Sequence, residues 1–215
     1  YTNGTKVTAM AKPKTIHDFG GFPKALYDEQ YPAPGDPKLA GDTKDLLKPT
    51  PVALDESWGL DHGAWPMLMH LFPKADIPVF QLSIDYYAKP EYHYELGKQL
   101  KSLRDKGVLI IGSGALIHNL PLAIKKMQTN DMSLFGWEME YDVWIKQQID
   151  KRNISNIINY ENSHKLGKLA APTPDHFVPI LYSLGLMDTK DDLQYFFESK
   201  PSLPAFSERS FIIKQ

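Results

Sequence analysis

Four histidines lie in loops or at the ends of expected elements, where side chains with chemical roles collect. They are His17, His62, His118 and His176. Imidazole with nearby carboxylates suits Fe, Zn, Cu or Ni, and the lack of cysteine favours a catalytic metal site over a structural one. None of the four forms a short metal motif such as His-Glu-x-x-His, so histidines satisfied by hydrogen bonds in the core remain an alternative.

His118 follows the stretch around which we expect the chain to be organised. The apolar, largely β-branched residues 108–111 predict a buried strand, and Gly112, Ser113 and Gly114 end it. Open α/β sheets bind ligands in the crevice beyond the carboxyl ends of their strands. The pattern therefore predicts that His118 lies at such a crevice.

The other three histidines have equally distinctive surroundings. His17 and Asp18 belong to a loop at 13–23 that two adjacent glycines allow to bend sharply. Asp61 precedes His62 between two tryptophans, and such a carboxylate can hold a histidine in one tautomer. His176 falls in the first turn of an expected helix, where the helix dipole favours the neutral imidazole that binds metals.

The strands and helices that must position these histidines are expected to alternate along the chain. This alternation predicts an α/β fold, a single domain with a mostly parallel or mixed central sheet flanked by helices. Further strands are expected at 5–10, 52–54, 77–84 and 210–213, and the clearest helices at 37–47, 90–106 and 137–149.

Composition excludes several classes of function. The 215 residues carry a formal charge of −2, which offers no basic surface for nucleic acid. No apolar run is long enough to span a membrane, so we expect no membrane partner, and the absence of cysteine suits the cytoplasm, where we expect the protein. The chain has neither the glycine pattern of a dinucleotide site nor the Gly-x-Ser-x-Gly of a serine hydrolase.

Several motifs in order resemble the class III extradiol ring-cleavage dioxygenases, in their 4,5-DOPA dioxygenase extradiol branch. They lie at 15–23, 31–35, 58–63, 81–85, 113–120 and 173–176, and the similarity runs from Tyr1 to roughly Leu186. The resemblance implies an enzyme that opens the ring of a catechol-type, DOPA-like substrate with O₂ at a non-haem metal centre. Fe(II) is the expected cofactor, with Zn(II) possible in the same site, and the protein is expected to be a monomer or small homo-oligomer.

The resemblance also implies roles for single residues. His176 matches a metal ligand, and His118 matches the catalytic acid/base histidine, close enough to the metal to count as a second candidate ligand. His62 matches a catalytic pocket histidine that hydrogen-bonds the substrate or the oxygen-derived ligands. His17 and Asp18 belong to a loop expected to border the substrate.

Two further metal histidines of the family have no counterpart here. They stand in Gly-His-Gly-Ser-Pro and Ser-Ala-His-Trp motifs, and Tyr1 aligns just after the second. We therefore expect residues 1–215 to form an extradiol dioxygenase catalytic domain that is incomplete at its N-terminus. One alternative is a non-catalytic metal- or ligand-binding remnant of that fold. A zinc hydrolase is a weaker one, because no glutamate suited to act as general base accompanies the histidine motifs.

Overall fold

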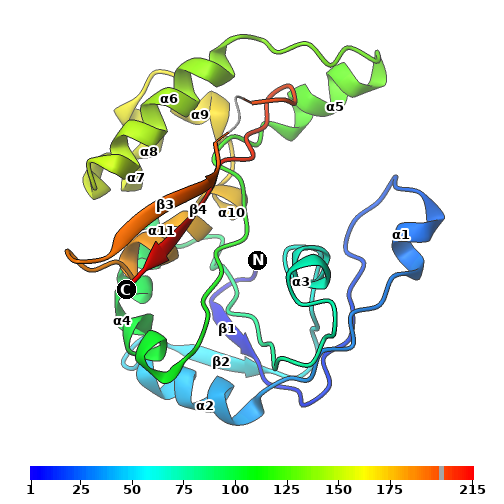
Figure 1. The fold of residues 1–215 in the computed structure, drawn as a ribbon, viewed down its shortest axis with the longest axis vertical. Helices are drawn as coiled ribbons and strands as arrows, with labels where there is room; N and C mark the ends of the chain where they lie inside the picture. The colour runs from blue at the N-terminus through cyan, green and yellow to red at the C-terminus, as the bar shows by residue number, and fades with distance from the viewer. Residues whose placement is uncertain (199–200) are drawn as a thin grey trace. The chain divides into compact units, whose positions relative to one another are not determined.

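A computed structural model describes residues 1–198 and 201–215. The chain divides into two compact units, Tyr1–Tyr87 and Ala88–Gln215, which Figure 1 traces from blue to red. Among the described residues, no helix is both long and apolar enough to cross a membrane. The prediction of one catalytic domain over residues 1–215 stays a prediction beside this division.

Unit 1 is built on a parallel pair of short strands. β1 (Thr5–Thr8) lies beside β2 (Val52–Asp55), with Thr5 opposite Val52 and Thr8 opposite Asp55. The connection includes α1 (Lys24–Asp28) and α2 (Pro37–Leu46), and α2 packs against both strands (Figure 1). As the sequence predicts, the Asp36 carboxylate accepts a hydrogen bond from the Leu39 N–H at 2.8 Å and caps α2.

The strand expected at 77–84 is wrong in extent. Its second half pairs with the N-terminal segment, through the Ser83 N–H to the Lys6 carbonyl at 2.8 Å and the Thr8 N–H to the Gln81 carbonyl at 3.0 Å. These contacts form isolated bridges rather than a strand. Pro78 has no N–H to donate, and the Gln81 N–H bonds the Thr8 hydroxyl instead of a backbone carbonyl.

The core of unit 1 brings the loop at 13–23 beside the segment 58–62. Leu60 and Trp65 are fully buried, the latter at the start of α3 (Trp65–Leu71). The Ile16 and Leu60 backbones bond, since the Ile16 N–H donates to the Leu60 carbonyl at 2.7 Å. The Trp65 indole N–H also donates to the Ile16 carbonyl at 3.0 Å. Residues 17–18 and 62 are therefore held close together.

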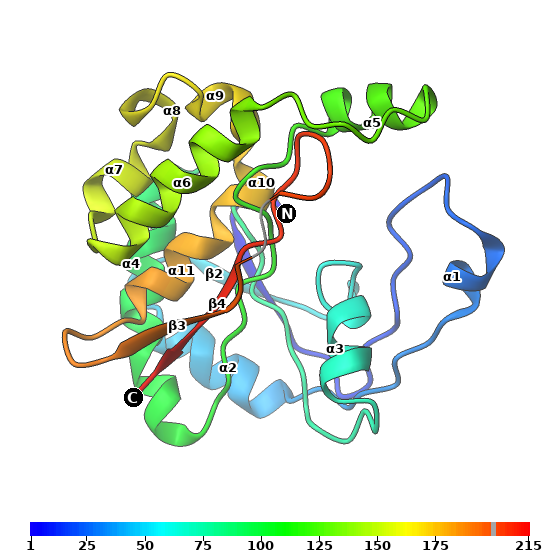
Figure 2. The same cartoon turned by 45° about the horizontal axis from the view of Figure 1, so that its top comes forward.

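Unit 2 is mainly helical (Figure 2). α4 (Pro90–Leu100) continues as a 3-10 helix (Lys101–Lys106) and ends at Gly107 in the left-handed conformation, φ 76°, as the predicted helix at 90–106 requires. The remaining helices are α5 (Leu120–Gln128), α6 (Trp137–Asp150), α7 (Ile154–Ile158), α8 (Tyr160–Ser163), α9 (Gly167–Ala170), α10 (Pro174–Phe177) and α11 (Pro179–Gly185).

The C-terminal part of unit 2 contains a ribbon of two antiparallel strands. β3 (Asp192–Phe197) pairs with β4 (Ser210–Lys214), which confirms the strand expected at 210–213. The Arg209 guanidinium, just before β4, donates to both carboxylate oxygens of Asp142 on α6, at 3.0 and 2.5 Å. Both side chains are at least nine-tenths buried, so this ion pair ties the ribbon to α6.

The buried strand predicted at 108–111 is wrong. These residues have no regular structure, and Leu109 and Ile111 are 61% and 38% exposed. The Val108 N–H bonds the Leu103 carbonyl within the end of the preceding helix, and no ladder follows in the part of the chain that the structure describes. A β-branched run forms a strand only when a neighbouring strand takes up its backbone groups. The α/β class is nevertheless confirmed, with a small parallel sheet, an antiparallel ribbon and flanking helices.

Candidate active site

His62 in unit 1 is held by Asp18. One carboxylate oxygen of Asp18 lies 3.0 Å from the His62 backbone nitrogen and 2.8 Å from its Nδ1. Burial alone would raise the pKa of Asp18, but the hydrogen bonds from His62 outweigh it and the pKa is lowered. An ionised Asp18 favours the tautomer with the proton on Nδ1, which leaves Nε2 to accept a proton or hydrogen bond. The His62 side chain is 48% exposed.

The neighbouring Asp61 does not hold His62, contrary to the interpretation of the sequence. Its two carboxylate oxygens accept hydrogen bonds from the Gln81 side-chain amide at 2.9 Å and from the Trp58 indole at 3.2 Å. Adjacent residues on a tight loop point in different directions, so the partner of His62 comes from a loop 44 positions earlier.

His17 belongs to an aromatic cluster next to Asp18. Its Nε2 lies 3.0 Å from the Glu29 carbonyl oxygen. Its ring meets the rings of Trp65 and Phe19 edge-on, at centroid distances of 5.4 and 5.8 Å. Phe19 in turn lies edge-on to His62 at 6.0 Å. His17, Asp18 and His62 therefore form one continuous group in unit 1.

Unit 2 brings His118 and His176 together and adds Asp175. The two imidazole rings stack at a centroid distance of 4.9 Å and an interplanar angle of 27°. One oxygen of Asp175 lies 2.8 Å from Nδ1 of His176. Nitrogen and oxygen atoms from all three side chains lie within 4.8 Å of one another, as a metal site requires.

A close backbone approach creates this group. The Ala115 N–H donates to the His176 carbonyl at 2.9 Å. A Cβ atom on Gly114 would stand 2.2 Å from that same oxygen, so only glycine allows the approach. The chain then runs to His118, whose N–H donates to the Ala170 carbonyl at 2.8 Å. His118 thus reaches α10 through the Gly-Ser-Gly segment, without the strand that the sequence predicted before it.

His118 is almost fully buried between two acceptors. Its Nδ1 lies 3.1 Å from the Ala115 carbonyl oxygen, and its Nε2 lies 3.0 Å from the carbonyl oxygen and 3.3 Å from the hydroxyl of Thr173. Burial lowers the pKa of His118, and the neighbouring His176 lowers it further. The neutral ring is therefore the resting form.

Asp175 is the residue that sequence reasoning missed. Burial opposes its ionisation, but contacts with His176 and the Thr173 hydroxyl hold the pKa of Asp175 well below its usual range. The carboxylate thus carries a negative charge beside two imidazoles. Its position directly before His176, in the first turn of α10, was the available signal.

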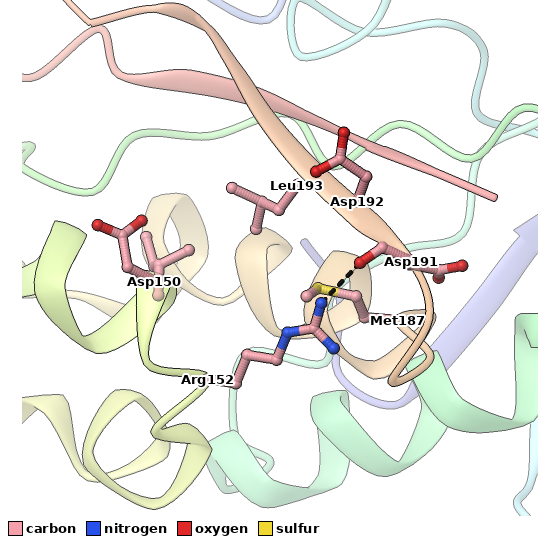
Figure 3. A pocket seen from close by; sticks show the side chains of 7 residues that line it. Asp150, Arg152, Met187, Asp191, Asp192 and Leu193 are labelled. Atoms are coloured by element: carbon pink, nitrogen blue, oxygen red, sulfur yellow. Dashed lines mark hydrogen bonds between the residues drawn. The ribbon is translucent and has the colours of Figure 1, made fainter.

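A cavity of about 230 Å³ lies in unit 2 among other residues (Figure 3). Its lining residues are Ile149, Asp150, Arg152, Met187, Asp191, Asp192 and Leu193. The guanidinium of Arg152 donates to the backbone carbonyls of Asp188 and Asp191 at 2.8 and 2.6 Å. The positive charge of Arg152 is therefore already paired with backbone carbonyl oxygens of the protein. None of the predicted site residues lines this cavity.

Comparison with known proteins identifies the family. Residues 1–203 match the catalytic LigB subunit of aromatic ring-opening dioxygenase. The chain is 44% identical to a 4,5-DOPA dioxygenase extradiol of Escherichia coli K12, over 90% of this chain and 71% of the relative. It is 40% identical to the 4,5-DOPA dioxygenase extradiol of Beta vulgaris, over 86% of this chain and 68% of the relative.

A solved structure agrees with these matches. The crystal structure of an uncharacterized protein from Escherichia coli K12 superposes with a TM-score of 0.76 at 36% identity, covering 95% of this chain and 79% of the other. The chain belongs to the LigB family of aromatic ring-opening dioxygenases. The predicted resemblance and the enzyme class, an extradiol dioxygenase, are confirmed.

Proposed function

We propose that the protein opens the ring of a catechol-type, DOPA-like substrate with O₂ beside the two hydroxyl groups, at a non-haem Fe(II). The observation that carries the proposal is the group of His118, Asp175 and His176 within 4.8 Å of one another. The relatives named 4,5-DOPA dioxygenase extradiol support the class of substrate.

The chemistry of the donors fits the metal. Imidazole and carboxylate are the ligand types of non-haem Fe(II) oxygenases, and Zn(II) accepts the same ligands without redox chemistry. We assign His176 and Asp175 as the first ligands, because Asp175 is ionised and unpaired by any lysine or arginine among the described residues. Bound Fe(II) would lower the pKa of a catechol hydroxyl and bind both the substrate and O₂.

His118 is better suited to move a proton than to bind the metal. A neutral His118 donates its Nδ1–H to the Ala115 carbonyl and accepts the phenolic proton at Nε2. The new Nε2–H then donates to the Thr173 carbonyl, 3.0 Å away, so both N–H groups of the charged ring are satisfied. His118 can return this proton during ring opening.

His62 serves, in this proposal, as the second catalytic histidine. Asp18 fixes its tautomer, and its Nε2 accepts a hydrogen bond from a substrate hydroxyl. His17 supports the Asp18 loop from within the aromatic cluster and borders the substrate.

The variant His118→Ala tests the assignment of the acid/base. We expect it to keep its iron and lose turnover on a catechol by roughly 10²–10⁴-fold, the range for a lost general base. Iron per chain is measured by elemental analysis, and turnover by the absorbance of the ring-opened product. Unchanged turnover would refute the role of His118, whereas loss of the iron would make His118 a ligand.

A further inference from the structure

Trp58 presents a large aromatic surface that the core of unit 1 does not use. Its side chain is 44% exposed, whereas Trp65 seven residues later is fully buried. Exposed tryptophans are unusual in loops because the indole gives up apolar burial, and a fixed one is typical of a binding surface. Whether the indole of Trp58 is fixed therefore bears on whether it forms part of a binding surface.

Hydrogen bonds fix the indole of Trp58. Its Nε1–H donates to Asp61 at 3.2 Å. Asp61 is fixed in turn by Gln81, whose amide donates to the Asp61 carboxylate at 2.9 Å and accepts from the Asp61 N–H at 3.0 Å. The Gly63 N–H donates to the same carboxylate at 3.1 Å. The polar edge of the indole is satisfied, while 44% of the residue stays exposed.

The backbone of Trp58 is fixed as well. One oxygen of Asp55 accepts from the Trp58 N–H at 3.0 Å and from the N–H and hydroxyl of Ser57 at 2.8 and 2.7 Å. Lys6 on β1 contacts the other oxygen of Asp55 at 3.2 Å. The loop 55–63 thus starts and ends on rigid contacts. Such pre-organisation lowers the entropy lost when a ligand binds.

Trp58 and His62 belong to the same short loop and flank Asp61. We propose that Trp58 is a specificity-determining residue that stacks on the planar, electron-rich ring of the catechol substrate, while Gln81 and Asp61 position its indole. The inference rests on the proposed function, in which His62 binds a hydroxyl group of that ring. Stacking suits a catechol because the ring has no charge of its own to be recognised, and offset stacking is favourable for aromatic pairs.

Kinetics of Trp58 variants of the iron-loaded protein test the proposal. Trp58→Ala should raise the KM for a catechol about tenfold, equivalent to about 1.4 kcal/mol, and leave kcat within about twofold. Trp58→Phe, which keeps a ring, should restore most of the affinity. Gln81→Leu should raise KM by a smaller factor, because the Trp58 indole remains but Asp61, which fixes it, loses its hydrogen bonds to Gln81. Tyr87→Ala is the matched control, since Tyr87 is 77% exposed in the same unit.

A binding measurement without turnover complements the kinetics. Catechol is titrated under nitrogen into the metal-free protein, and the tryptophan fluorescence of wild type and Trp58→Phe is compared. The proposal predicts quenching in the wild type that Trp58→Phe largely loses. It is overturned if Trp58→Ala keeps the wild-type KM and the quenching does not depend on Trp58.

The two failures are distinguishable. If the wild type cleaves no catechol but shows Trp58-dependent quenching, the proposed function fails and the aromatic-binding role of Trp58 stands. If the wild type cleaves catechols and Trp58→Ala does so with unchanged KM, the proposed function stands and the substrate-stacking role of Trp58 fails.

Discussion

The imidazole of His118 lies between the backbone carbonyls of Ala115 and Thr173, and it stacks on His176. Carbonyl oxygens accept hydrogen bonds but cannot donate them, so the neutral ring satisfies only one of the two. The protonated ring satisfies both, yet burial and the second histidine oppose it. These opposing influences suit a residue that must gain a proton and lose it again within one reaction.

At the same scale, the proposed assignment of His176 and Asp175 as metal ligands can be tested by substitution. His176→Ala and Asp175→Asn should each weaken iron binding by about 10-fold or more, because each removes one ligand from a small set. His70→Ala is the control, since His70 is exposed on α3 and belongs to no candidate site. Iron affinity is measured by competition with a chelator. Equal affinities for the His176 and His70 variants would contradict the assignment.

Among the elements, α4 and α11 cross with their backbones in close contact. A Cβ atom on Gly97 would stand 2.4 Å from the Tyr182 carbonyl oxygen, and one on Gly185 would stand 2.5 Å from that of Tyr94. The helices touch backbone to backbone, and α11 follows directly from the helix that carries His176. The crossing therefore holds α11 in place, and with it the end of the α10 segment that carries His176.

Gly97→Ala should destabilise the protein by about 1–3 kcal/mol, because the added methyl group forces the two helices apart. Gly41→Ala on α2 is the matched control, since beyond its chain neighbours and its own helix backbone no described atom lies within 4 Å of its would-be Cβ. Alanine favours a helix over glycine, so this control should stabilise by roughly 0.5–1 kcal/mol. Urea unfolding measures both. A Gly97→Ala protein as stable as the wild type would show that the crossing is looser than described.

Elements whose signal is local could be predicted from the sequence. The Asp36 cap before Pro37 and the glycine at 107 act on their own turns, and both helices end or begin where expected. The absence of a strand at 108–111 could not be predicted, because strand formation depends on a partner strand far along the chain. The same division holds for the site. His118 and His176 carry local motifs, whereas the contact of Asp18 with His62 depends on tertiary packing.

At the scale of the whole molecule, one buried ion pair links stability to pH. Asp191 is paired with Arg104 at 2.5 Å, and the two side chains are 5% and 12% exposed. Burial alone would raise the pKa of Asp191, but Arg104 and the Asp188 N–H lower it below its ordinary value of 3.8. A lowered pKa means that the folded state favours the ionised form. The stabilisation is complete above pH 3.8 and is lost as the pH falls further.

Asp191→Asn should therefore lower the free energy of unfolding by roughly 3–5 kcal/mol at pH 7, because Arg104 stays buried without its counter-charge. The gap to the wild type should narrow only below pH 3.8, because the lowered pKa of Asp191 keeps the folded wild-type carboxylate ionised until the pH falls further. Asp28→Asn removes an exposed pair with Lys24 and should change stability by less than about 0.5 kcal/mol. A gap that stays the same size from pH 7 down to a pH at which the wild-type carboxylate is protonated would show that the charge of Asp191 does not matter.

The central claim is that the protein uses a non-haem metal to insert O₂ into a catechol-type ring, and oxygen uptake tests it most directly. Iron-loaded protein is given a catechol in an oxygen electrode, with the matching meta-diol as the control. Uptake of one molecule of O₂ per catechol, accompanied by a ring-opened product and absent with the meta-diol, is the predicted result. No uptake with any catechol by protein that has bound its iron would contradict the account.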